Sequence, residues 1–146
     1  MPRDIPVGNG SLLITFDDLY RIRDLYSPRV GRHNHTNGHV QRFGVWVDGQ
    51  MAWIEDDAWH RTLQYKPDTL TTEVTLVHNE LGIEIISNDV VDLHEPVYFR
   101  KLNVRDLAGK ARDVRLFFHC DFSINGSPVG DTANYDPSTR AVILVH

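Results

Sequence analysis

Apolar and polar residues alternate with a period of two along most of this chain. The alternation is clearest from residue 114 to residue 122, where one face carries Val114, Leu116, Phe118, Cys120 and Phe122. A period of two predicts a β-strand that buries one face. We therefore predict that this face lies in the core and that Cys120 is a buried thiol. No window long enough for a substantial helix has apolar residues at helical spacing, so the chain is predicted to be all-β.

Turn residues divide the alternating pattern into strands. Asp48-Gly49 lies between two apolar runs within Arg42 to Trp53, and this dipeptide favours the type I′ turn of a β-hairpin. Another strand is predicted from Trp59 to Tyr65, where Pro67-Asp68 ends it. Three more pairs of strands are predicted on the same grounds: 11–16 with 21–26, 71–77 with 83–86, and 97–104 with 114–122.

Many short antiparallel strands must bury one face each, which favours a sandwich or a barrel. We predict an antiparallel two-sheet β-sandwich formed by one domain, residues 1–146. The sequence stops in the apolar run from Ala141 to His146, whereas a domain usually ends in exposed polar residues. We expect a domain cut before its natural end, with an unpaired strand edge through which copies of the chain self-associate.

Charge and composition exclude several classes of partner. The net charge is −5, so the chain offers no basic face to a nucleic acid. No apolar stretch approaches the length of a membrane span, so no membrane partner is expected. The first residues lack the features of a secretory signal, which predicts a cytoplasmic protein. A neutral ligand or another protein domain remains the expected partner.

Several short motifs together resemble one enzyme family. In the first half of the chain they lie between Ile5 and Trp53, and in the second half between Phe117 and Tyr135. The motifs are Val7-Gly8-Asn9-Gly10, Asp24-Leu25-Tyr26, Val30-Gly31, Asn34-His35-Thr36, Phe117-Phe118-His119-x-Asp121-Phe122 and Val129-Gly130-Asp131-Thr132-Ala133-x-Tyr135. They resemble the N-terminal domain of prokaryotic glucoamylase-like and trehalase-like proteins of glycoside hydrolase family 15.

The resemblance implies a large N-terminal β-sandwich, or supersandwich, followed by a catalytic barrel of paired α-helices. The barrel supplies the general acid and base of an inverting hydrolase acting on α-glucosides, such as starch-type oligosaccharides or trehalose. By this resemblance the barrel is the domain's partner and an α-glucoside is the substrate of the whole enzyme. We predict no catalytic residue, no metal and no cofactor in this chain, which alone should be inactive.

The loop from Arg32 to His39 is the leading candidate for a functional site. The resemblance implies that this loop packs toward the barrel and borders its active site. Amide, imidazole and hydroxyl groups can all donate and accept hydrogen bonds with sugar hydroxyls. The candidate residues at the substrate rim or the domain interface are Asn34, His35, Thr36 and His39.

Two other functions use different residues. Trp53 and Trp59 could stack on sugar rings, which would make the chain an independent carbohydrate-binding module, although aromatic residues at strand spacing more often fill a core. His33, His35 and His39 could bind zinc in a small metal-dependent hydrolase, if they converge and leave one position open for water. A catalytic carboxylate pair would have to come from Glu55, Asp57, Glu84 and Asp121, whose spacing marks no matched pair.

Overall fold

The computed structural model describes residues 5–127 and 129–146. Within them, β-strands are joined by turns and loops, with a single short 3-10 helix, η1 (Ile124–Gly126). The strands are β1 (Ile5–Gly8), β2 (Leu13–Phe16), β3 (Ile22–Tyr26), β4 (Arg42–Val47), β5 (Gln50–Trp53), β6 (Trp59–Tyr65), β7 (Thr72–His78), β8 (Ile83–Val91), β9 (Tyr98–Asp106), β10 (Val114–His119), β11 (Thr132–Asp136) and β12 (Ala141–Val145). These described residues contain no helix that is long and apolar enough to cross a membrane.

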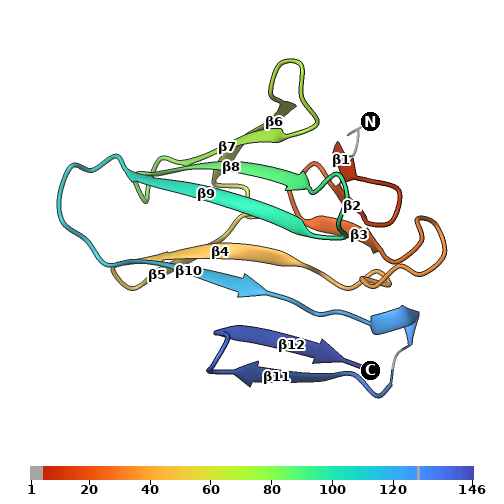
Figure 1. Cartoon of the computed structure of the whole chain (residues 1–146). Coiled ribbons are helices and arrows are strands. Elements are labelled where there is room, and N and C mark those ends of the chain that lie inside the picture. Colours follow the sequence, from red (N-terminus) through yellow and green to blue (C-terminus); the bar gives the residue numbers. More distant parts are fainter. Residues whose placement is uncertain (1–4, 128) are drawn as a thin grey trace.

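All strand pairs within the described residues are antiparallel. The four-stranded sheet has the order β6-β7-β8-β9, and two three-stranded sheets have the orders β1-β2-β3 and β10-β4-β5. Strands β11 and β12 form a separate two-stranded sheet. Figure 1 shows the β6–β9 sheet facing the sheet that contains β4 and β10. The prediction of an all-β, sandwich-like fold is confirmed.

One apolar core joins the three larger sheets. Side chains from β2, β4, β7 and β8 alternate into it, as a period of two requires. Fully buried members include Ile14, Phe43, Val45, Leu76 and Ile85. Each of these three sheets therefore buries one face against the others, as expected for stacked sheets.

The Asp48-Gly49 hairpin is confirmed. Strands β4 and β5 pair in register, with Val47 opposite Gln50. Both turn residues adopt positive φ, 48° at Asp48 and 97° at Gly49, as a type I′ turn requires. Within the same hairpin, Gly44 allows close packing, because a Cβ there would lie 2.8 Å from the backbone oxygen of Ala52.

One predicted hairpin is wrong. Strands β9 and β10 do not pair with each other: β9 is the end strand of the four-stranded sheet, beside β8, and β10 joins β4 in another sheet. The connection of residues 107–113 crosses from one sheet to the other. Arg112 fixes this crossing by donating hydrogen bonds to the carbonyl oxygens of Leu81 (2.8 Å) and Gly82 (3.2 Å) and to Asp106. The connection therefore joins the two layers of the sandwich.

The predicted core face from residue 114 to 122 is only partly buried. Val114 and Leu116 pack against the core, but Phe118 is 59 % exposed. The strand ends at His119, and Cys120 is exposed. The expectation of a buried Cys120 thiol is therefore wrong, because Cys120 lies beyond the strand that was expected to bury it.

Candidate functional site

The predicted rim loop joins β3 to β4 and is folded by its own side chains. At its tip, His39 N–H donates to the carbonyl oxygen of Thr36 at 2.7 Å. The two residues between them, Asn37 and Gly38, have φ values of 46° and 84°. An Asn-Gly pair tolerates this left-handed geometry, which explains why the sequence turns at this point.

Asn34 and Thr36 hold the loop on β3. The Asn34 side-chain oxygen accepts hydrogen bonds from Leu25 N–H (3.0 Å) and from the Thr36 hydroxyl (2.9 Å). Its amide nitrogen donates to Asp24 at 2.7 Å. Thr36 is 0 % exposed, and its hydroxyl also lies 2.7 Å from the Arg23 carbonyl oxygen. These two side chains are therefore already engaged by the protein itself.

His35 links the loop to the region around η1. Its Nδ1 accepts from Asn125 N–H at 3.2 Å, and its Nε2 lies 2.8 Å from the Ser27 carbonyl oxygen. A backbone N–H can donate only to an unprotonated ring nitrogen, so the proton sits on Nε2. The backbone carbonyl of His35 accepts from Ser123 N–H at 2.7 Å. His35 therefore serves as a bridge between two segments far apart in sequence.

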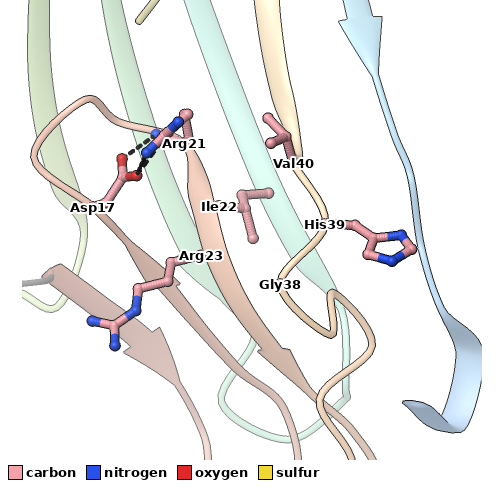
Figure 2. A pocket seen from close by; sticks show the side chains of 7 residues that line it. All are labelled: Asp17, Arg21, Ile22, Arg23, Gly38, His39 and Val40. Carbon is pink, nitrogen blue, oxygen red and sulfur yellow. Dashed lines mark hydrogen bonds and ion pairs between the residues drawn. The ribbon is translucent and has the colours of Figure 1, made fainter.

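A groove of about 170 Å³ runs beside the loop, between it and β3. Figure 2 shows Asp17 and Arg21 paired at one end of this groove, and the Arg23 side chain pointing away from that pair. The His39 ring points to the other side of the loop, where its Nδ1 lies 3.1 Å from Asp121 Oδ1. Of the four predicted rim residues, His39 is the one whose side chain is exposed. The residue lines the groove, but its ring nitrogen pairs with Asp121.

The two tryptophans proposed for sugar stacking are occupied within the protein. Trp59 is 3 % exposed and packs edge-on against His78, with ring centroids 5.0 Å apart. Trp53 is half-buried, and the Arg42 guanidinium lies 4.4 Å from its ring centroid. A buried indole has no face to offer a sugar ring, so the structure does not present the pair as an open stacking platform.

The histidines considered for zinc are not gathered. His35 and His39 have the separate partners described above, and the described residues contain no group of three or more His, Cys, Asp or Glu side chains placed to hold a metal. His33 is half-buried. The convergent geometry that the metal-dependent alternative requires is therefore not formed by these residues.

A buried polar cluster that we did not predict lies between the sheets. Its centre is Asp89 on β8, which is 0 % exposed. Oδ1 accepts hydrogen bonds from the Tyr98 hydroxyl and from Arg100 Nε (2.7 Å), both on β9. Oδ2 accepts from the Tyr20 hydroxyl and from the Thr72 hydroxyl (2.9 Å). We call Asp89, Arg100, Tyr20, Tyr98 and Thr72 the Asp89 cluster.

Strand register brings the charged members together. Asp89 lies directly opposite Arg100 in the β8–β9 pair. Tyr20 comes from the turn between β2 and β3, where it adopts φ 64°, a strained conformation for a bulky residue. Burial raises the pKa of both phenols, Tyr20 and Tyr98, well above the ordinary value for tyrosine. Both therefore stay neutral and donate hydrogen bonds to the carboxylate.

Two members of the Asp89 cluster, Tyr98 and Arg100, also line an apolar cavity of about 250 Å³. The Arg100 guanidinium lies 5.0–5.7 Å from the ring centroids of four aromatic residues, a cation–π arrangement. The cavity continues past Phe118 to Cys120 and Phe122. Cys120 as a residue is exposed, but its thiol is partly desolvated where it lines this cavity, which raises the thiol pKa and so lowers its thiolate fraction and its reactivity. The cavity suits an apolar group.

The sequence did contain a signal for the Asp89 cluster. The alternation of β8 continues beyond the predicted end of the strand at Ile86, through Ser87 and Asp89 to Val91, all of which are buried. An acid on the apolar face of a strand must have a buried partner. Identifying that partner as Arg100 requires the β8–β9 register, which sequence alone does not supply.

The acids considered for catalysis form ion pairs in separate places. Glu55 pairs with Arg42, and Glu84 lies 3.1 Å from Arg105 on the outer face of the four-stranded sheet. Asp121 faces His39, while Asp57 lies in the exposed turn before β6. The structure therefore does not combine them into one site.

Comparison with known proteins gives one curated match. No family model matches the chain, and no solved structure matches it. The chain is 27 % identical over 129 residues to an uncharacterized glycosyl hydrolase of Methanocaldococcus jannaschii. The match covers 88 % of this chain and 20 % of the relative, so the chain spans about a fifth of the length of the curated relative it matches. This similarity supports a relationship to glycoside hydrolases.

Proposed function

We propose that this chain is a non-catalytic N-terminal β-sandwich domain of a glucoamylase-like glycoside hydrolase that acts on α-glucosides. One observation carries the proposal: the similarity to a glycosyl hydrolase extends over most of this chain but over only a fifth of the relative. A segment that forms a small part of a much larger hydrolase can fold as a domain without containing the reacting groups. The motifs that resemble family 15 lead to the same proposal.

The state of the acids agrees with a supporting role. A glycosidase needs one protonated carboxyl and one ionised carboxylate on either side of a sugar. Asp89 is the most deeply placed acid of those described above, but it is fully buried and its oxygens accept four hydrogen bonds. It is therefore unavailable to a substrate or to a catalytic water. The Asp89 cluster joins strands, which is a structural role.

The rim loop fits the proposed contact with a helical catalytic barrel. Asn34, His35 and Thr36 use their side chains to fix the loop on β3 and at η1. A loop fixed in this way loses little conformational entropy when another domain docks on it. His39 on the loop and Asp121, which lies beside it after β10, are both exposed, and they are polar groups that this region could present to a sugar. We propose that the loop supplies shape and these two residues supply contacts.

Glucose release from maltose, trehalose and short maltooligosaccharides tests the proposal. The purified chain and the full-length Methanocaldococcus relative are assayed in parallel on each substrate. We expect glucose only from the longer protein. Release by this chain alone, proportional to its concentration, would overturn the non-catalytic assignment. A relative that is inactive on every α-glucoside but hydrolyses another glycoside would overturn the substrate class.

A further inference from the structure

The apolar cavity beside Arg100 contains a charged hydrogen-bond donor that is only partly used. Arg100 lines this cavity, and within the described residues its guanidinium donates one hydrogen bond, from Nε to Asp89 Oδ1 at 2.7 Å. Its Nη2 is buried and has no hydrogen-bond partner. Buried donors without an acceptor are uncommon in folded proteins. The guanidinium therefore indicates a place where a ligand oxygen binds. We call this space the Arg100 cavity.

The other walls of the Arg100 cavity are mainly apolar and come from both layers of the sandwich. Tyr98 reaches the cavity from β9 of the four-stranded sheet, and Phe118 reaches it from β10 of the facing sheet. The aliphatic and phenylalanine residues of its lining are Ile22, Leu25, Phe118 and Phe122. Its volume of about 250 Å³ is just below the roughly 300–1,000 Å³ of pockets that hold drug-sized ligands. Its ligand is therefore small and mostly apolar.

Arg100 is the polar group of the lining that remains to orient a ligand. Both ends of the Gln41 amide bond to the backbone that follows β10. The Arg42 guanidinium stacks on Trp53, on the outer face of β4. The Arg100 charge, in contrast, acts on Cys120 of the cavity wall, where it opposes the larger effect of desolvation on the thiol pKa. The aromatic rings around the guanidinium are weaker acceptors than an oxygen atom.

The charge of Arg100 is already balanced, and this selects the kind of acceptor. Arg100 forms an ion pair with Asp89, which is 0 % exposed. A ligand carboxylate would add a second negative charge to a buried pair that is neutral, and burying an unbalanced charge is costly. A carbonyl oxygen accepts an N–H without adding charge. The pair therefore favours a neutral acceptor over an anion.

We propose that the Arg100 cavity binds a small apolar molecule that carries one neutral carbonyl oxygen, with the oxygen on the Arg100 guanidinium. A sugar does not suit this cavity, because most of its hydroxyls would lose water without gaining a partner. The site therefore goes beyond the proposed function, since its ligand is not a glycoside and the site requires no catalytic domain.

Protection of Cys120 measures binding at this site. Cys120 is the only cysteine and lines the cavity, so an occupied cavity should slow its alkylation by iodoacetamide. Acetophenone is the carbonyl probe, ethylbenzene has nearly the same shape without an acceptor, and benzoate carries a charge. We expect acetophenone to slow alkylation in a saturable way and to bind at least about tenfold more tightly than ethylbenzene, because a hydrogen bond from a charged donor is lost. Benzoate should bind more weakly than acetophenone.

Variants at two exposed phenylalanines locate the site. Phe118→Ala removes part of the cavity wall and should weaken binding of acetophenone and ethylbenzene alike. Phe99→Ala is the matched control, because Phe99 is 55 % exposed and Phe118 59 % exposed, but Phe99 does not line the cavity. It should bind both probes like the unmodified chain.

The double variant Asp89→Leu/Arg100→Met tests the donor, because it removes the guanidinium without leaving a buried charge. Its folding is checked by cooperative urea unfolding, and it should bind acetophenone and ethylbenzene with nearly equal affinity. No protection by acetophenone up to its solubility, or equal affinity of the unmodified chain for acetophenone and ethylbenzene, would overturn the proposal. Tighter binding of benzoate would overturn the neutral acceptor, and an equal loss in Phe99→Ala would overturn the location.

Discussion

Replacing Asp89 by Asn should destabilise the protein far more than a similar change at the surface. Asn keeps the shape of Asp but presents an NH₂ group to hydroxyls that donate hydrogen bonds to the carboxylate. It also removes the carboxylate that pairs with Arg100, whose side chain is 12 % exposed. Breaking a buried ion pair by removing one partner costs about 3–5 kcal/mol. We therefore expect the free energy of unfolding to fall by that amount.

A matched control exists on the same two strands. Glu84 faces Arg105 across β8 and β9, just as Asp89 faces Arg100, but this second pair lies on the outer face and Arg105 is 69 % exposed. Exposed ion pairs contribute roughly 0.2–1 kcal/mol. Glu84→Gln should therefore change the free energy of unfolding by less than about 1 kcal/mol. Both variants alter one acid of one cross-strand pair, so burial is the main difference between them.

Urea unfolding followed by tryptophan fluorescence measures both effects. At about 2 kcal/mol per molar urea, a loss of 4 kcal/mol lowers the midpoint by about 2 M. For a chain of 146 residues, the total stability is on the order of 7–20 kcal/mol, so Asp89→Asn can remain folded and measurable. Equal midpoints for Asp89→Asn and Glu84→Gln would refute the reasoning. Asp89→Leu combined with Arg100→Met should lose less stability than Asp89→Asn, because no unpaired charge is left buried.

Three further predictions concern other parts of the chain. Gly44→Ala should lower stability by about 1–3 kcal/mol in urea unfolding, because its Cβ would clash with the Ala52 backbone oxygen. Asp136 accepts hydrogen bonds in the turn between β11 and β12, and these bonds lower the pKa of its carboxyl to about 2. The turn should therefore be fully stabilised above pH 3.8 and lose this stabilisation as the pH falls toward 2. Amide NMR of the turn residues would show the change. Burial raises the pKa of Tyr20 and Tyr98, so stability should fall above pH 10, and ultraviolet titration should show these phenols ionising only on unfolding.

The features that sequence predicted well are those that local chemistry determines. The Asp48-Gly49 turn needs two residues that tolerate positive φ, and the dipeptide supplies both. The same reasoning failed for β9 and β10, because Leu107 to Lys110 also reads as a hairpin turn. There the partner is decided by long-range pairing: β10 joins β4 in another sheet and leaves β9 at the end of the four-stranded sheet. Turn residues show that the chain bends, but they do not specify which sheet the next strand joins.

The candidate loop illustrates a second limit of sequence reasoning. Its polar side chains were predicted to face a sugar because they can donate and accept hydrogen bonds. The same property lets Asn34 and Thr36 bond to the backbone of β3, and the structure uses them in this way. Residue type alone cannot separate the two uses, because both need identical donors and acceptors. Exposure separates them, and it depends on the whole fold.

The Asp89 cluster sets strand register as well as contributing stability. A slip of one residue between β8 and β9 would turn Arg100 to the outer face, and a slip of two would place Tyr98 or Leu102 opposite Asp89. Either slip leaves the carboxylate buried without its charge partner, which is far more costly than exchanging one apolar contact for another. The cluster therefore discriminates between registers that an all-apolar interior would tolerate.

The same cluster connects the core to the candidate loop. Tyr20 is held at φ 64°, a conformation that costs on the order of 1–3 kcal/mol for a residue other than glycine. Its hydroxyl bonds to Ser87 (2.6 Å) and to Asp89 offset that strain and fix the turn that leads into β3. Strand β3 in turn supplies the Leu25 backbone groups to which Asn34 and His35 bind. The position of the loop thus depends on a buried acid in another sheet, which makes the Asp89 cluster a positioning element for the proposed domain contact.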